Sequence, residues 1–165
     1  MVYFIAGGIN SGKSTTLVSL FNASKTNLNL EVKHFAGGFV SEKQLIHNKR
    51  FSYTLRNLNT NETIPLAIDQ SDFNDEFSNI IIYNRFNFNK DAFKYANSIL
   101  TDLSKDSMIT DIFIDEIGKI EIQGEGFASG FKIALDSRKN LYVCVRESLL
   151  PDVIETFHIT NYQIM

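Results

Sequence analysis

A glycine-rich segment near the start of the chain has the residue types needed to hold phosphate groups. Residues 7–14 read Gly-Gly-Ile-Asn-Ser-Gly-Lys-Ser, which matches the phosphate-binding loop (P-loop) pattern G-x-x-x-x-G-K-[ST]. Glycines let backbone N–H groups approach an anion, and a following helix N-terminus adds a partial positive charge. Lys13 can contact the β- and γ-phosphates of a nucleotide, and the Ser14 hydroxyl can bind Mg²⁺. The predicted nucleotide-binding residues here are Gly7, Gly8, Ile9, Asn10, Ser11, Gly12, Lys13, Ser14 and Thr15.

The residues on either side give this pattern the context that its chemistry requires. Residues 2–6 form an apolar run that predicts a buried strand, and residues 15–23 are compatible with a helix. The alternative is a glycine turn that happens to precede Lys-Ser. The strand–loop–helix context disfavours that alternative, because a P-loop needs this arrangement.

An apolar run that ends in two carboxylates predicts the second half of the site. Residues 112–114 predict a strand, and Asp115 and Glu116 follow directly. A strand-end carboxylate can reach Mg²⁺ opposite Ser14, so Asp115 is predicted to be a metal ligand. Successive strand residues point different ways, so Glu116 is free to orient or deprotonate a water that attacks the γ-phosphate. The alternative is a solvated acidic turn.

Two cationic residues are further candidates for the site. Lys119 follows Glu116 by three residues and can act as an internal cationic finger on the γ-phosphate, or lie on the surface. Arg146 directly follows the predicted strand at residues 141–145. Its guanidinium can stack on a nucleobase, or again be an ordinary surface group. We therefore take Lys13, Glu116 and Lys119 as the catalytic candidates.

Other polar residues give weaker signals. Glu42 can hold a water or a cation, or be a plain loop carboxylate, and its role stays open together with those of Arg50 and Arg146. Arg56 lies on the polar face of its strand and is expected to be solvated. The histidines His34, His47 and His158 do not have the spacing of a metal site.

The order of predicted elements indicates an α/β fold. Strands are predicted at residues 2–6, 31–35, 51–58, 63–68, 80–83, 112–114, 141–145 and 156–159, and helices at 15–23, 91–103 and 127–135. This alternation predicts a three-layer sandwich with a mostly parallel sheet. The turn Asn59-Thr60-Asn61 joins two alternating segments, which predicts an inserted antiparallel β-hairpin, with Pro65 at an edge or a break in pairing.

Composition limits the class of protein. The chain has 165 residues, 44% hydrophobic and 21% charged, which suits a single domain over residues 1–165. A net charge of −3 predicts neither general nucleic-acid binding nor attachment to an anionic membrane. The lone Cys144 lies in an apolar run and is expected to be buried and inert. The sequence shows no signal peptide and no paired cysteines, so we expect a cytoplasmic protein.

Residues 115–121, Asp-Glu-Ile-Gly-Lys-Ile-Glu, resemble the D-E-I-G-K-M-E segment of the THEP-type (cancer-related) nucleoside-triphosphatase family. Residues 38–42 resemble its G-F-x-T-x-E segment, and Arg50-Phe51 resembles a compressed R-x-G-F. The resemblance extends over about residues 3–147. It implies a compact P-loop NTPase domain that hydrolyses the terminal phosphate of several nucleoside triphosphates with Mg²⁺. The hairpin glycine and the usual C-terminal residues of the family are missing, which bears on base preference and turnover.

The leading interpretation is Mg²⁺-dependent hydrolysis of ATP, GTP or other nucleoside triphosphates with broad base specificity. One alternative is a small P-loop nucleoside or nucleotide kinase. Such kinases usually carry an arginine-rich lid, whereas only Arg138 and Arg146 occur between residues 112 and 150. The other alternative is a slow nucleotide-binding switch or adaptor for a protein partner of unknown identity.

Overall fold

The computed structural model describes residues 1–26, 35–45, 51–72 and 77–165. Within these ranges the helices are α1 (Lys13–Thr26), α2 (Lys90–Lys105), α3 (Lys119–Ile122), α4 (Ala128–Asp136) and α5 (Leu150–Thr156). The strands are β1 (Val2–Gly7), β2 (Phe35–Leu45), β3 (Phe51–Asn57), β4 (Thr63–Asp69), β5 (Ile80–Tyr83), β6 (Phe86–Asn89), β7 (Ile109–Ile117), β8 (Asn140–Arg146) and β9 (Tyr162–Ile164). The expected α/β fold is therefore found. No helix in the described residues is both long enough and apolar enough to cross a membrane.

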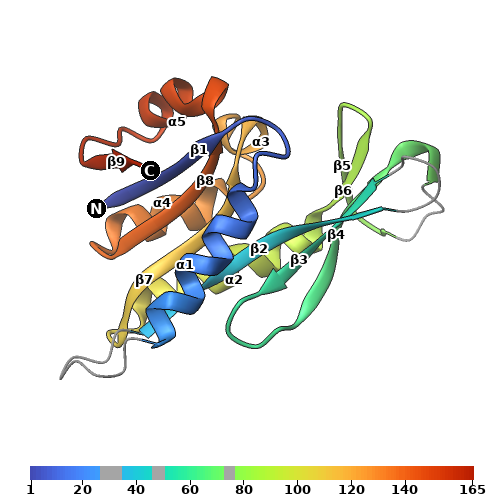
Figure 1. The fold of residues 1–165 in the computed structure, drawn as a ribbon. Helices are drawn as coiled ribbons and strands as arrows, with labels where there is room; N and C mark the ends of the chain where they lie inside the picture. The colour runs from blue at the N-terminus through green and yellow to red at the C-terminus, as the bar shows by residue number, and fades with distance from the viewer. Residues whose placement is uncertain (27–34, 46–50, 73–76) are drawn as a thin grey trace.

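The described strands form one mixed sheet in the order β5-β6-β4-β3-β2-β7-β8-β1-β9. The pairings from β2 through β7, β8 and β1 to β9 are parallel, and those from β2 through β3, β4 and β6 to β5 are antiparallel. The antiparallel strands lie to one side of α1 and α5 (Figure 1). In the parallel part, β1, β7 and β8 lie side by side, so their carboxyl ends meet at one edge of the sheet.

Helices cover both faces of the parallel strands. On one face α1 packs Leu17 and Phe21 against Phe113 of β7 and Cys144 of β8. On the other face α2 and α4 pack onto a larger cluster, whose fully buried members include Phe4, Leu100, Ile112, Phe131 and Val143. Neighbouring residues of one strand thus enter different clusters, which explains why the parallel strands are apolar at successive positions.

Helix α2 has the clearest sequence signal of the described helices. Ala92, Phe93, Ala96, Ile99 and Leu100 repeat at helical spacing and are all buried. Just before the helix, the Asn89 side chain accepts a hydrogen bond from the backbone N–H of Asp91, a typical N-cap. The predicted helix at 91–103 is therefore confirmed, with one added residue before it and two after it.

The strand predicted at residues 31–35 is only partly within the described residues. Strand β2 begins at Phe35 and continues to Leu45, while residues 31–34 lie outside the described ranges. Its first half pairs parallel with β7 and its second half antiparallel with β3. β3 pairs antiparallel with β4 across the predicted turn, and the register shifts beside Pro65. A proline cannot donate to the ladder, which accounts for that shift.

The strand predicted at residues 156–159 is wrong, because this stretch is the end of a helix. Pro151 occupies the first turn of α5, where its missing N–H is harmless. Leu150, Val153 and Phe157 recur at helical spacing and are buried. His158 then has φ of 53°, which ends the helix. The strand at this end of the chain is β9, which pairs with β1.

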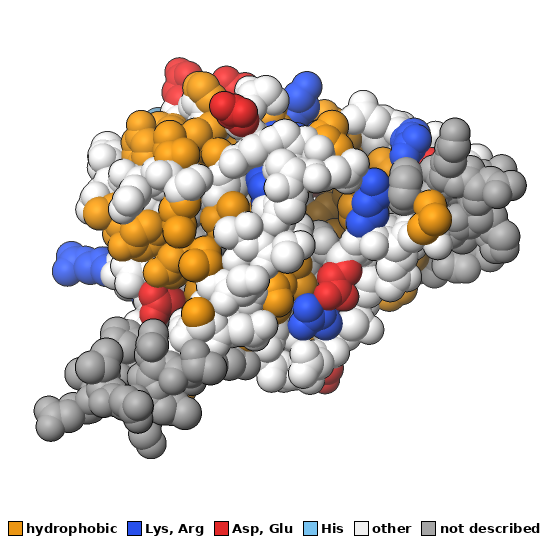
Figure 2. Space-filling view, viewed as in Figure 1, with side chains coloured by type: hydrophobic (Ala, Val, Ile, Leu, Met, Phe, Trp, Pro, Cys, Tyr) orange, Lys and Arg blue, Asp and Glu red, His pale blue; other side chains and the backbone are white. Residues whose placement is uncertain are grey.

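The β9 edge of the sheet exposes several apolar side chains. Figure 2 shows hydrophobic side chains gathered over β9 and the adjacent start of β1. The large ones that are exposed here are Met1, Tyr162, Ile164 and Met165. This edge lies at the opposite end of β1 from the P-loop.

Candidate nucleotide-binding and hydrolytic site

The P-loop connects β1 to α1 directly. β1 ends at Gly7 and α1 begins at Lys13, where the Thr16 N–H donates to the Gly12 carbonyl at 2.9 Å. A Cβ at Gly7 would lie 2.5 Å from Ser11 Oγ, so Ser11 would have to shift to admit a side chain there. The loop therefore curls tightly over the start of the helix. The predicted strand, loop and helix are all found in this order, and the helix begins two residues earlier than expected.

Lys13 lies across the loop that precedes it. Its Nζ donates to the carbonyls of Gly8 at 2.9 Å and Gly7 at 3.3 Å. The residue is 8% exposed, although its ammonium is also 3.7 Å from Glu116 Oε2. The loop thus holds a cation beside the end of β7, where a phosphate group would need it.

Asp115 is buried at the end of β7 and is surrounded by hydrogen-bond donors. Its Oδ2 accepts from the Ser41 N–H at 3.2 Å, and it also accepts from the side chains of Ser14 and Cys144. The Ser41 hydroxyl donates to the Asp115 carbonyl at 2.6 Å, so β2 is tied to this strand end. Burial raises the pKa of Asp115 to about 6, although the hydrogen bonds from Ser14, Cys144 and the Ser41 N–H act in the opposite direction.

Glu116 has different neighbours from Asp115, at a place where the register between β7 and β8 shifts and the regular alternation of a strand does not apply. Its carboxylate lies between two cations: Oε2 is 3.7 Å from Lys13 Nζ, and Oε1 is 3.0 Å from Arg146 Nε. The Glu116 side chain is 28% exposed, so water can reach it. The structure therefore brings Lys13 of α1, Glu116 of β7 and Arg146 of β8 together, although these elements are far apart in sequence.

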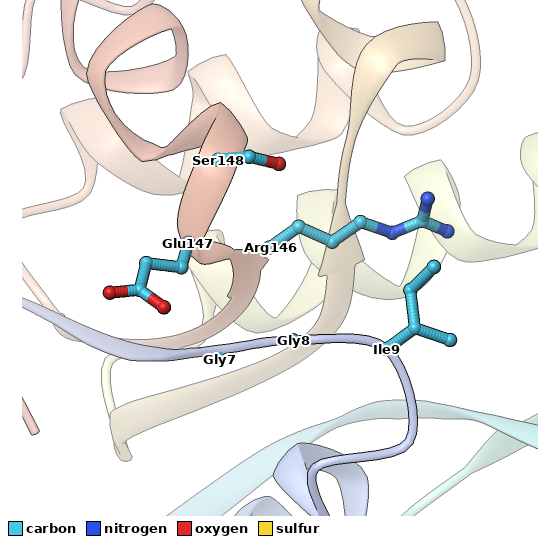
Figure 3. Close-up of a pocket in the computed structure, with 6 residues that line it drawn as sticks. All are labelled: Gly7, Gly8, Ile9, Arg146, Glu147 and Ser148. Carbon is cyan, nitrogen blue, oxygen red and sulfur yellow. The ribbon is translucent and has the colours of Figure 1, made fainter.

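A pocket of about 450 Å³ lies beside this charge cluster. It is lined by Gly7, Gly8, Ile9, Arg146, Glu147 and Ser148. In Figure 3 the Arg146 side chain extends from the end of β8 toward the side chain of Ile9, while Glu147 points the other way. The pocket is open to solvent, because Ile9 is 72% exposed and the Arg146 side chain is about half exposed.

Of the weaker candidates, Lys119 lies on the surface, which is one of the two alternatives predicted for it, whereas Glu42 and Arg56 have surroundings that differ from those expected. Lys119 is exposed at the start of α3, and its described contacts include none with the P-loop or Glu116. Glu42 belongs to β2 and not to a loop, and its Oε1 lies 2.7 Å from Arg56 Nη2. Arg56 is thus ion-paired and mostly covered, where we expected a solvated side chain. Arg50 lies outside the described residues.

Several residues near the site carry no local sequence signal. Ser41 and Cys144 both contact Asp115, and Lys43 Nζ donates to Asn10 Oδ1 of the P-loop at 3.3 Å. Ser41 and Lys43 alternate along β2, so placing β2 beside β7 would have pointed to both. Cys144 is buried as expected, and burial raises the pKa of its thiol far above its usual value.

The oxygen atoms near Asp115 fit a magnesium ion held together with phosphate. The Asp115 carboxylate and the Ser14 hydroxyl are hard oxygen ligands that contact each other. Among the described residues no group of three or more His, Cys, Asp or Glu could hold a metal alone. Mg²⁺ commonly takes one or two protein oxygens and completes its shell with water and substrate phosphates. The residues present suit that mode of binding.

Comparison with known proteins agrees with the α/β fold and with NTP hydrolysis in general. The family model described as NTPase matches residues 2–164. The structure is similar to the solution structure of a human cancer-related nucleoside triphosphatase, with a TM-score of 0.65 and 18% sequence identity. That likeness covers 99% of this chain and 86% of the human chain. The comparison with curated protein sequences found no significant match to this chain.

The fold and the site define a P-loop nucleotide-binding enzyme. Because the family model matches nearly the whole chain, the chain belongs to the THEP-type NTPase family and is an NTP-hydrolysing enzyme. The family that the sequence suggested is therefore confirmed.

Proposed function

We propose that the protein hydrolyses nucleoside 5′-triphosphates to diphosphate and phosphate in a Mg²⁺-dependent reaction with broad base specificity. The observation that carries the proposal is the position of Glu116. Its carboxylate lies 3.7 Å from the P-loop lysine near the end of β7, and its side chain is 28% exposed. A base next to the cation that binds the terminal phosphates is well placed to act on an attacking water.

Each residue of the site has a proposed role. The backbone N–H groups of residues 8–15 and the Lys13 ammonium bind the β- and γ-phosphates. Glu116 takes a proton from a water whose oxygen forms a bond to Pγ. The bond between Pγ and the β,γ-bridging oxygen breaks, and the leaving diphosphate keeps the electron pair. Inorganic phosphate results, and Glu116 returns the proton to solvent.

Asp115 and Ser14 are the proposed ligands of Mg²⁺, which when bound supplies positive charge to the phosphate oxygens. Asp115 is only 2% exposed, so its carboxylate is held in place before any metal arrives. Lys119 is proposed as an additional cation that reaches the phosphates only after its exposed side chain reorients.

The test is the substitution Glu116→Gln, which keeps the shape of the side chain and removes its basicity. Hydrolysis should fall by roughly 10²–10⁴-fold while binding of the Mg²⁺–nucleotide complex is retained, because a general base acts on the reaction and not on the ground state. Phosphate release and equilibrium binding of a labelled nucleotide measure the two effects. Glu155→Gln, on the exposed side of α5, is the matched control. Parental turnover in Glu116→Gln would remove Glu116 from the reaction.

The same phosphate-release assay, run with ATP, GTP, CTP and UTP, tests base specificity. Values of kcat/KM within about tenfold of each other are expected, because the proposed contacts are to phosphate and metal, which every nucleotide presents alike. A hydrogen-bonding base pocket can reject a mismatched base by roughly 10⁴-fold. A preference above about a thousandfold would therefore contradict broad specificity. Phosphate transfer to an added nucleoside, in place of release, would favour the kinase alternative.

A further inference from the structure

Arg146 is bound to the residue that we propose as the general base. Its Nε donates to Glu116 Oε1 at 3.0 Å, and Glu116 Oε2 lies 3.7 Å from Lys13 Nζ. The two cations therefore contact different oxygens of one carboxylate. This arrangement holds the guanidinium beside the carboxylate that Lys13 also contacts.

The position of Arg146 in the sheet explains why it lies there. Arg146 is the last residue of β8 and is paired with Gly7, the last residue of β1, in the parallel ladder. Its side chain leaves the sheet beside the first residues of the P-loop and reaches toward Ile9 (Figure 3). The pairing of β8 with β1 thus places the guanidinium beside the first residues of the P-loop.

Among the contacts of the described residues, the one with Glu116 leaves other N–H donors of the Arg146 guanidinium available. An arginine carries five N–H groups, and the contact with Glu116 uses the one on Nε. The side chain is 49% exposed and borders the 450 Å³ pocket, so its terminal N–H groups can reach a ligand there. A planar fork of donors suits phosphate oxygens better than a single ammonium does.

We propose that Arg146 contacts the γ-phosphoryl group during its transfer to water and stabilises the charge of the transition state. The inference rests on the proposed hydrolysis and deepens it. As water adds to Pγ and the bond to the bridging oxygen breaks, charge spreads over the three outer oxygens of the phosphoryl group. The terminal N–H groups of Arg146 donate to one of these oxygens, while its Nε keeps Glu116 oriented toward the water.

This assignment replaces stacking on a nucleobase, the role that the sequence suggested for Arg146. The nucleobase of a nucleoside triphosphate lies at the opposite end of the molecule from the γ-phosphoryl group. A guanidinium that is bound to the general base Glu116 cannot also lie against the nucleobase. Stacking would also act equally on ground and transition states, whereas a phosphoryl contact acts mainly on the transition state.

The test compares two ligands in Arg146→Ala: Mg²⁺–ADP alone, and Mg²⁺–ADP with aluminium fluoride, which mimics the phosphoryl group in transfer. We expect ADP affinity to change less than about threefold, and the added affinity from aluminium fluoride to fall by roughly 10²-fold or more. In steady state, kcat should fall by about 10²–10³-fold with KM nearly unchanged for ATP, GTP, CTP and UTP alike. Arg146→Lys keeps the charge without the fork and should fall between the wild type and Arg146→Ala.

Arg138→Gly is the matched control, because it removes an exposed arginine from a turn where φ is 60°, a conformation that glycine tolerates. It should leave both ligand affinities and kcat unchanged. Loss of ADP affinity in Arg146→Ala with the aluminium fluoride increment intact would overturn the proposal in favour of base stacking. No change in either measurement would also overturn it. A wild-type protein that binds nucleotide but releases no phosphate would instead refute the proposed function itself.

Discussion

Glu121 is a buried carboxylate close to the site that takes no part in the proposed chemistry. It is 4% exposed, and its two oxygens accept the N–H groups of Gly118 at 2.9 Å and Phe127 at 3.1 Å. It therefore joins the turn after Glu116 to the start of α4. Burial raises the pKa of Glu121 to about 7, although both backbone hydrogen bonds act in the opposite direction.

This shift makes the stability of the protein depend on pH. The unfolded chain has a Glu121 pKa near 4.5, so the folded form binds the proton more tightly. The resulting stabilisation is complete below about pH 4.5 and is lost as pH rises toward 7. At about 1.4 kcal/mol per pKa unit, the change is on the order of 3 kcal/mol. Glu121→Gln should remove this part of the pH dependence.

Urea unfolding of the wild type and Glu121→Gln at several values between pH 4.5 and 8 measures the effect. The readout is the slope of unfolding free energy against pH, since loss of one hydrogen bond also changes the absolute value. Glu125→Gln, at an exposed position in the same segment, should keep the wild-type slope. Equal slopes for wild type and Glu121→Gln would show that the burial of Glu121 does not perturb its titration.

At the scale of the elements, the contact between β2 and β7 sets the distance of Ser41 from Asp115. Gly38 of β2 pairs with Phe113 of β7, and a Cβ at Gly38 would overlap the Phe113 carbonyl oxygen. Its φ of 149° is also a conformation that side chains disfavour. The two strands can approach this closely only because position 38 is glycine.

We therefore expect Gly38→Ala to destabilise the protein by roughly 3 kcal/mol or more, since backbone overlap adds to conformational strain. Gly124→Ala separates the two causes. Gly124 has φ of 84°, and a Cβ there would meet no atom within 4 Å. That variant should lose only about 1–2 kcal/mol. Denaturant unfolding compares them, and equal losses would mean that the close strand contact contributes nothing.

The elements also show what local patterns can and cannot predict. The P-loop, the Asp115-Glu116 pair and α2 were predicted because each depends on residues that are neighbours in sequence. Helix α5 was misread because seven residues give about two turns, too few for a clear periodicity. Two other contacts depend on which strands lie side by side: that of Arg146 with Glu116 and that of Ser41 with Asp115. The order of strands in a sheet cannot be predicted from the sequence of any one segment.

At the scale of the whole molecule, the site exists only when the parallel centre of the sheet is assembled. Lys13 begins α1 after β1, Asp115 and Glu116 lie near the end of β7, and Arg146 ends β8, so each contact joins segments far apart in the chain. Any ligand that bridges these segments binds the folded state and not the unfolded one. A bound nucleotide should therefore stabilise the entire sheet in proportion to its concentration and affinity.

The rate of chemical modification of Cys144 can be used to measure this stabilisation by nucleotide. It is the one cysteine of the chain, and its thiol is fully buried under α1 beside Phe113. A thiol-reactive dye can modify it only in molecules whose α1 has separated from the sheet. Modification in native buffer should be slower than in urea by roughly 10³-fold or more, because such openings are rare in a stable domain.

Saturating nucleotide should slow that modification further, by a factor that grows with ligand concentration, because α1 begins at the phosphate loop. Cys144→Ser gives the background signal. Rapid modification in native buffer, unaffected by nucleotide, would mean that α1 opens independently of the site. The rate at which Cys144 is modified thus measures how often α1 separates from the sheet. It also reports nucleotide binding without any measurement of turnover.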